Sequence, residues 1–261
     1  MIDLHTHILH GLDDGPPDLD GSVAMARAAV RAGTTAVATT SHINVGFGLT
    51  TEHLRAARAE LAERLERDGI PLELLAGGEV APEKLPDLDD ATLRAVTLGG
   101  GDCILLECPF PPVGAAMEPM VADLHRRGFT VLLAHPERSA SFQQDPGRLR
   151  RLVDMGAWAQ VTSGALDGGF GERAQRAGMA MLEAGLVHVL ASDSHDPQYR
   201  PPDPRLADRA LAERYGDIEE QLAWMTEAAP AALVAGTPLP PRPALPRARG
   251  MRARLRSWSA R

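Results

Sequence analysis

Two histidines with a spacing of two residues follow the first apolar segment of the chain. His5 and His7 come at the end of residues 1–4, which we predict to form a short strand. Side chains alternate across a strand, so residues i and i+2 project to the same side. Two imidazoles at one strand end can bind the same divalent cation, and the carboxylate of Asp14 follows a few residues later. The spacing alone equally fits two polar residues in a turn, so the metal hypothesis depends on partners elsewhere in the chain.

Residues of the same chemistry follow later apolar segments. They are His42, Glu79, Glu107, His135, Asp193 and His195. In a β/α barrel the carboxyl ends of the strands converge on one face, where active sites are built. Polar loop residues placed by chance would not put a histidine or an acidic residue after six of the seven predicted strands. The sequence therefore predicts one shared site.

The segments that carry these residues alternate between strand and helix patterns. Strands are predicted at residues 1–4, 36–40, 72–76, 103–106, 130–134, 158–161 and 187–191. Helices are predicted at residues 22–32, 51–69, 117–127, 148–155 and 172–184. This alternation predicts an α/β fold with a parallel sheet, and seven units suggest a closed or nearly closed, TIM-like barrel.

The composition is that of one large globular domain, which we assign to residues 1–235. Apolar residues make up 44% of the 261-residue chain but aromatic residues only 4%, so Ala, Val and Leu must build the core. No apolar run approaches the ~20 residues that span a bilayer. The amino terminus enters a strand directly, without a basic region or cleavage site, so we expect no signal peptide and a cytoplasmic protein.

Two cysteines bear on the choice of mechanism. Cys103 and Cys108 do not form a disulfide framework, and neither begins a Cys-x5-Arg loop, since Pro109 and Gly114 occupy the sixth position after them. The sequence therefore disfavours a phosphatase with a cysteine nucleophile.

Residues 236–261 differ from the rest of the chain. They contain seven arginines and no acidic residue, whereas the remaining body carries an excess of Asp and Glu over Lys and Arg. This Pro- and Arg-rich composition predicts a mostly disordered, solvated basic tail. Contact with nucleic acid, with membrane phosphates or with the acidic body of a neighbouring subunit is the alternative. We expect no specific nucleic-acid partner, and oligomerisation is left open.

The candidate ligands define the class of metal. Imidazoles and carboxylates without thiolates suit Mn, Fe or Zn in a catalytic centre better than a structural zinc site. Five histidines and four carboxylates exceed the needs of one ion, so two or three divalent ions are expected. Clustered metals lower the pKa of bound water and stabilise the entering and leaving oxygens of a displacement. The sequence thus predicts hydrolysis, most plausibly of a phosphate ester.

Eight motifs in order connect the chain to a known family. They are MIDLHTHILHGLDDGP, TSHI, GGEV, LLECPF, LAHPER, QVTSGAL, FGER and ASDSHD, spread over residues 1–235. In these motifs the chain resembles the PHP (polymerase and histidinol phosphatase) superfamily, in particular its bacterial manganese-dependent protein-tyrosine phosphatases encoded with capsule and exopolysaccharide genes. The resemblance implies a distorted seven-stranded β/α barrel, in agreement with the strand count.

The resemblance also implies a role for each candidate residue. His5, His7, Glu79 and Asp193 would hold one metal; Glu79 would bridge to a second, held also by Glu107 and His135; and Asp14, His42 and His195 would hold a third. Manganese is the expected ion, with zinc or iron as alternatives. Arg138 and Arg200 match positions that bind the substrate phosphate, although a surface salt bridge is the alternative for either. Asp13, next to Asp14, is expected to support a ligand or to cap a turn.

The implied activity is hydrolysis of phosphotyrosine by a metal-bound hydroxide. The partner would be a phosphotyrosyl protein, for example the tail of a tyrosine autokinase in polysaccharide export. A small-molecule phosphatase acting on histidinol phosphate, or a phosphodi- or triesterase, would use the same metals. An amidohydrolase is disfavoured because the only lysine, Lys84, falls in a predicted loop, and a non-enzymatic scaffold because every ligand type is present. The segment INVGFGLTTEH after Ser41-His42 departs from many relatives, which place a His or Arg there.

Overall fold

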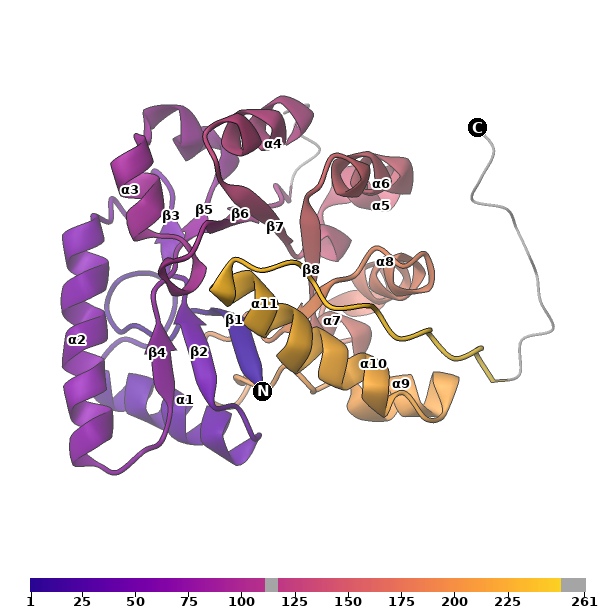
Figure 1. Cartoon of the computed structure of the whole chain (residues 1–261). Coiled ribbons are helices and arrows are strands. Elements are labelled where there is room, and N and C mark those ends of the chain that lie inside the picture. The colour runs from indigo at the N-terminus through magenta and orange to yellow at the C-terminus, as the bar shows by residue number, and fades with distance from the viewer. Residues whose placement is uncertain (111–116, 250–261) are drawn as a thin grey trace.

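Parallel strands carry the whole architecture. The computed structural model describes residues 1–110 and 117–249, and within them nine strands pair in two parallel sheets (Figure 1). The strands are β1 (Ile2–Thr6), β2 (Ala36–Thr39), β3 (His42–Ile43), β4 (Glu73–Leu75), β5 (Glu79–Val80), β6 (Cys103–Glu107), β7 (Thr130–Ala134), β8 (Trp158–Thr162) and β9 (Val189–Ala191). One sheet has the order β1-β2-β4, and the other has the order β3-β5-β6-β7-β8-β9. The predicted α/β fold with a parallel sheet is confirmed at this level.

Two predicted strands are each divided in the structure. The segments predicted at residues 36–40 and 72–76 pair within the first sheet as β2 and β4, and the chain then continues into β3 and β5 of the second sheet. The crossing between sheets is tight, because a Cβ on Gly77 or Gly78 would lie 3.0 Å from side-chain atoms of Thr40 or Ile43. Pairing partners, which local sequence does not encode, therefore decide where these strands break.

The edge strands of the two sheets, β1 and β9, also lie side by side. The amide of Asp193 donates to the carbonyl of His5 over 2.9 Å, and the amide of His7 donates to the carbonyl of Ser194 over the same distance. The buried carboxylate of Asp3 accepts from the amide of Ser192 at 3.0 Å. Residues that are far apart in the sequence are thus joined just where β1 and β9 end.

Helices surround the strands (Figure 1). They are α1 (Leu19–Arg31), α2 (Thr51–Arg67), α3 (Asp90–Ala95), α4 (Met117–Arg126), α5 (Ala140–Gln144), α6 (Pro146–Asp154), α7 (Ser163–Leu166), α8 (Gly171–Glu183), α9 (Asp208–Tyr215), α10 (Glu219–Ala223) and α11 (Ala229–Ala235). Along β6, Cys103 and Leu105 face one apolar cluster whereas Ile104 and Leu106 face another. Strands buried on both faces are typical of parallel sheets covered by helices.

The first half of the predicted tail lies against the body. Residues 236–249 contain no helix or strand, as expected, but Trp224 Nε1 donates to the carbonyl of Pro240 over 3.1 Å. The guanidinium of Arg242 stacks on Trp224 at 4.7 Å and donates to the carbonyl of Val187 at 2.6 Å. These contacts differ from the disordered tail expected from composition. Residues 250–261 lie outside the described part of the chain.

None of the helices in the described residues has the length and apolar character needed to cross a membrane.

Candidate metal centre

All nine predicted ligands come together at one end of the strands. Their nitrogen and oxygen atoms form four overlapping groups, within each of which the atoms lie no more than 4.8 Å apart. The groups are His5–His7–Asp193, His5–Glu79–His135, His42–Glu79–Glu107 and His7–Asp14–His42–His195. The structure thus places every one of these residues as the sequence predicts, while their role as metal ligands stays a prediction.

Two of these residues have an unusual backbone. Among the described residues, the only non-glycine residues with positive φ are His135 (φ 38°) and Asp193 (φ 50°). His135 directly follows β7, and Asp193 lies two residues beyond β9. Such a conformation costs about 1–3 kcal/mol and persists where the surroundings impose it. Here it turns the chain sharply at a strand end while both side chains stay among the candidate ligands.

His5 and His7, the innermost histidines, each lie close to the carboxylates of Asp193 and Glu79. The Nε2 atoms of His5 and His7 lie 3.2 Å apart, and each is 3.5 Å from Asp193 Oδ1. Glu79 Oε2 lies 3.4 Å from His5 Nε2 and 3.5 Å from His7 Nε2. Ligand atoms ~2.1 Å from a shared ion at tetrahedral angles are about 3.4 Å apart. The atoms of His5, His7 and Asp193 therefore have the spacing that a divalent cation requires, and Glu79 Oε2 has the same spacing to the two imidazoles.

Glu79 is the carboxylate that all the inner imidazoles share. It is fully buried; its Oε1 lies 2.8 Å from His135 Nε2, and its Oε2 lies 2.9 Å from His42 Nδ1. Despite that approach, Glu79 Oε2 and His42 Nδ1 make no hydrogen bond of regular geometry. Buried polar atoms without partners are rare and costly, so this pair fits a cation between ligands better than a hydrogen-bonded pair.

The shifted pKa values of the cluster also fit a cation-binding site. Burial alone would raise the pKa of Glu79, but His5, His135 and His42 hold it well below its usual range. Burial and the charge of Glu79 raise the pKa of Glu107 to about 7, and Asp13 and Glu79 outweigh burial to raise the pKa of His7 to about 10. Glu107 and His7 thus hold protons close to neutral pH. A divalent cation that binds these side chains would displace those protons.

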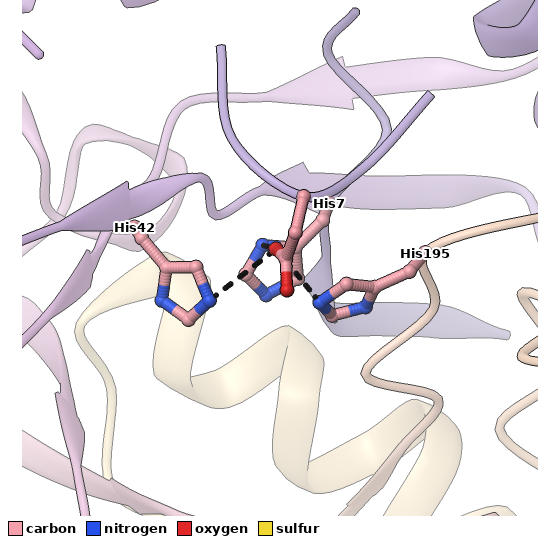
Figure 2. A group of neighbouring side chains, drawn as sticks. His7, His42 and His195 are labelled. Atoms are coloured by element: carbon pink, nitrogen blue, oxygen red, sulfur yellow. Dashed lines mark ion pairs between the residues drawn. The ribbon is translucent and has the colours of Figure 1, made fainter. Parts of the chain in front are cut away.

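A second, more open group lies nearer the surface. Asp14 Oδ1 is 3.1 Å from His195 Nε2 and 3.5 Å from His42 Nε2, and Figure 2 shows the imidazoles of this group gathered around that carboxylate. The Asp14 side chain is 53% exposed, whereas that of Glu79 is fully buried. The hydrogen bond from His195 holds the pKa of Asp14 well below its usual range. The outer group thus contains an ionised carboxylate that is partly exposed to solvent.

Hydrogen bonds to their Nδ1 atoms orient His5, which lies in β1, and His7, which directly follows it. The Nδ1 of His7 lies 2.9 Å from Asp13 Oδ2, which also accepts from the amide of His42 at 3.0 Å. The Nδ1 of His5 lies 3.0 Å from the amide oxygen of Gln160 in β8. Because each Nδ1 donates to an oxygen, each Nε2 is the ring nitrogen that faces the centre and would bind a cation once its proton is released. Asp13 thus contacts the candidate ligand His7, and its other oxygen accepts from the amide of Gly15 in a turn.

Gln160 is the residue that sequence reasoning missed. It is fully buried and also accepts from the amide of His135 at 3.3 Å, so it joins two of the candidate ligands. The available signal was a polar residue inside the apolar strand predicted at 158–161, one strand over from the histidine that follows residues 130–134.

The two arginines converge on Asp193. Arg200 Nη2 lies 2.8 Å from Asp193 Oδ2, and Arg138 Nη1 donates to the same oxygen. Both guanidiniums lie over the ring of Phe170, at 4.4 Å for Arg138 and 5.5 Å for Arg200. Since Asp193 Oδ1 faces the histidines, the carboxylate connects the arginines to the inner group. Neither arginine therefore makes the isolated surface salt bridge that was the alternative.

A parallel α/β fold whose strands end at clustered imidazoles and carboxylates is typical of metal-dependent hydrolases. The profile of the capsular polysaccharide synthesis family CpsB/CapC matches residues 1–231, and the chain belongs to this family. The resemblance to phosphatases encoded with capsule genes is thereby confirmed.

Named relatives cover most of the chain. The tyrosine-protein phosphatase YwqE of Bacillus subtilis is 38% identical over 201 residues, which are 77% of this chain and 79% of that protein. The tyrosine-protein phosphatase CpsB of Streptococcus pneumoniae is 28% identical over 222 residues, which are 83% of this chain and 91% of that protein. A crystal structure from work on YwqE and CpsB, described as unique metal-dependent tyrosine phosphatases, superposes with a TM-score of 0.81 at 34% identity. It covers 94% of this chain and 99% of that one.

Proposed function

We propose that this protein is a metal-dependent tyrosine-protein phosphatase that hydrolyses phosphotyrosine in a protein substrate. The observation that carries the proposal is Asp193, whose two oxygens face His5 on one side and two arginines on the other. A site that joins a candidate metal position to two guanidiniums suits a phosphate ester, which carries its negative charge on several oxygens. Membership of the CpsB/CapC family and the named relatives support the same activity. A cytoplasmic location and a phosphotyrosyl protein partner belong to this proposal.

The centre is proposed to bind two or three divalent ions, with manganese as the first candidate. As the resemblance implies, His5, His7, Glu79 and Asp193 would hold the first ion; Glu79, Glu107 and His135 the second; and Asp14, His42 and His195 the third. Glu79 lies in one group with His135 and in another with Glu107, which fits its role as the shared carboxylate. Bound divalent ions lower the pKa of coordinated water and offset charge on phosphate oxygens. The orphaned, buried Glu79 Oε2 supports this assignment, because a cation would satisfy it.

The chain's own residues would bind and orient the phosphoryl group. Arg138 and Arg200 present planar guanidiniums, which suit bidentate contact with phosphate. The ring of Phe170 under both guanidiniums limits their rotation, so they would reach the phosphate with little further loss of freedom. Asp193 holds them beside the inner group before substrate binds. Asp13 and Gln160 would keep His7 and His5 in the tautomers that the centre needs.

The proposal includes the fold as a distorted seven-stranded barrel. β2 with β3 and β4 with β5 would each count as one strand that changes sheets, giving seven chain segments in sequence. The hydrogen bonds between the ends of β1 and β9 support closure at that edge. A barrel would explain why side chains from all seven segments reach one centre.

Phosphate release from a phosphotyrosyl peptide tests the activity. The rate would be compared for chelator-stripped protein, manganese-reloaded protein and the His5→Ala variant, with His125→Ala on α4 as a matched histidine control. Histidinol phosphate and a phosphodiester would be assayed in parallel. We expect peptide turnover that requires both manganese and His5 and exceeds turnover of the other substrates. Faster turnover of histidinol phosphate or the diester would show that the protein acts on another class of phosphate ester. Absence of metal-dependent turnover would refute phosphoesterase activity.

A further inference from the structure

Exposed apolar side chains are concentrated around the candidate centre. Among the described residues, four of the six exposed large apolar side chains lie in segments that follow or adjoin site residues. These four are Val45, Phe47, Phe110 and Tyr199. Single exposed apolar residues are ordinary, but their gathering around one charged cluster marks a surface that contacts an apolar group.

The phenylalanines show this concentration most clearly. The chain has only five, and Phe129 and Phe142 are buried in the core. The other three contact charged or imidazole groups of the centre: Phe170 lies under both arginines, Phe47 on His42 and Phe110 on His135. A chain poor in aromatic residues therefore places three of its five phenylalanines at the candidate site.

Phe47 and Phe110 have equivalent positions relative to Glu79. The ring of Phe47 lies 5.8 Å from that of His42 with an interplanar angle of 3°, and the ring of Phe110 lies 5.2 Å from that of His135 with an angle of 12°. His42 and His135 contact different oxygens of the Glu79 carboxylate. Each phenylalanine is thus one imidazole away from Glu79, and each is 42% exposed.

Phe110 also lies next to a proposed phosphate-binding group. The guanidinium of Arg138 lies 4.8 Å from the centre of its ring. An ester whose phosphate is held by Arg138 would place the group attached to its bridging oxygen near Phe110. The short spacing between phosphate-binding and apolar surfaces suits a substrate in which a ring is attached directly to the phosphate.

We propose that Phe47 and Phe110 bind the phenyl ring of the substrate and select aryl over alkyl phosphates. This inference rests on the proposed phosphatase function and assigns its specificity to two named residues. Aromatic rings in offset or edge contact gain more than their buried area alone provides. Phe47 lies in the segment INVGFGLTTEH that follows His42, and its half-exposed ring gives the site an apolar surface beside that imidazole.

Binding of two inert analogues tests the proposal without relying on turnover. Phenylphosphonate and methylphosphonate share the phosphonate group, and only the first carries a ring. Their dissociation constants would be measured by calorimetry on manganese-loaded wild type, Phe47→Ala and Phe110→Ala, with Met155→Ala as a control that removes another exposed apolar side chain. We expect each phenylalanine variant to reduce the preference for phenylphosphonate by about three- to tenfold. Methylphosphonate binding and metal content should stay unchanged, and Met155→Ala should match wild type.

Two further variants separate ring binding from support of the histidines. Phe47→Tyr and Phe110→Tyr keep a ring and should keep the preference. If the phenylalanines only hold His42 and His135 in place, the alanine variants would lose metal and weaken both phosphonates equally, which would overturn the proposal. An unchanged preference in the alanine variants would also overturn it. Peptide hydrolysis on the same preparations tests the phosphatase function separately. If the protein does not hydrolyse the peptide but still binds phenylphosphonate through the two phenylalanines, the phosphatase activity is refuted and the aryl-binding site is retained.

Discussion

The two ends of the strands differ in the kind of polar group that is left without a hydrogen-bond partner: at the amino end it is the hydroxyl of Thr34, just before β2, whereas at the carboxyl end it includes candidate metal ligands. At the carboxyl end, Glu79 Oε2, His42 Nδ1 and His135 Nδ1 are buried without a hydrogen-bond partner. At the amino end, Arg242 donates to the carbonyls of Gly185 and Val187, which precede β9. There too, the amide and hydroxyl of Thr35 both donate to the carbonyl of Met1.

This difference separates a face built for chemistry from a face built for stability. An unsatisfied buried polar group costs about 1–3 kcal/mol, and a strained backbone position costs a similar amount. Both kinds of cost meet at His135, which has a positive φ and an orphaned Nδ1. A fold tolerates such features where they serve a function, and hydrogen bonds such as those of Arg242 and Thr35 at the amino end help to offset their cost.

Replacing Glu79 should have the largest effect, because this carboxylate belongs to two of the candidate ligand groups, one with His5 and His135 and one with His42 and Glu107. We expect Glu79→Gln to lower metal-dependent turnover by more than about 10³-fold, since the amide has no charge to bind or bridge cations. Metal content measured by elemental analysis should fall together with the rate. Glu137→Gln is the matched control, because Glu137 is also fully buried but keeps its bond to the amide of Thr162 through an oxygen that glutamine retains. Equal losses in both variants would contradict a special role for Glu79.

Replacing Asp14 should have an intermediate effect, because its carboxylate is partly exposed to solvent. We expect Asp14→Asn to reduce turnover by about 10²-fold and to remove one bound metal per chain, while the inner positions stay occupied. The measurement combines steady-state rates with metal content after dialysis. Loss of all bound metal would show that the inner and outer groups cannot be separated.

Replacing Gln160 should have a smaller effect, because its side chain contacts the candidate ligands His5 and His135 and would not itself bind an ion. We expect Gln160→Leu to weaken metal binding by about tenfold, since the His5 Nδ1 proton would lose its acceptor and the ring would rotate more freely. A metal titration with turnover as the readout would show recovery of most activity at high manganese concentration. A rate that stays low at saturating manganese would instead place Gln160 in substrate binding.

The carboxyl end was more predictable from the sequence than the amino end. The convergence of His5 and His7 could be predicted because a spacing of two on a strand fixes their common direction, and that of the other candidate ligands because parallel strands end at one face. Gln160 has no such spacing signal. Its role depends on the neighbour relation between β7 and β8, which only the fold establishes.

The contacts of residues 236–249 and the divided strands could not be predicted, for a related reason. Arginine and proline indicate a solvated tail, but Arg242 finds the ring of Trp224 and two free carbonyls on a surface formed by distant segments. Likewise, the break between β2 and β3 depends on which strands each half pairs with. Local pattern predicts which segments are extended, while their partners are set by tertiary structure.

Substitutions at the amino end of the strands should change stability and leave activity almost unchanged. A substitution of His188 tests this most directly. His188 precedes β9, its Nδ1 accepts from the amide of Ala159 at 3.2 Å, and burial with the nearby charge of Arg242 lowers its pKa to about 3. Because this pKa is lower than in the unfolded chain, the unfolded state binds a proton first, and stability falls as the pH decreases from about 6.5 toward 3.

We expect chelator-stripped wild type to lose about 1–2 kcal/mol more stability between pH 7 and pH 5 than His188→Asn, whose amide oxygen accepts the same hydrogen bond without titrating. Denaturant unfolding at the two pH values measures the difference. Turnover of the metal-loaded variant at pH 7 should stay within about twofold of wild type, because His188 lies at the opposite end of the strand from Asp193. Equal pH dependence in the two proteins would mean that His188 is already protonated in the fold, and a large loss of turnover would show that the two ends are not independent.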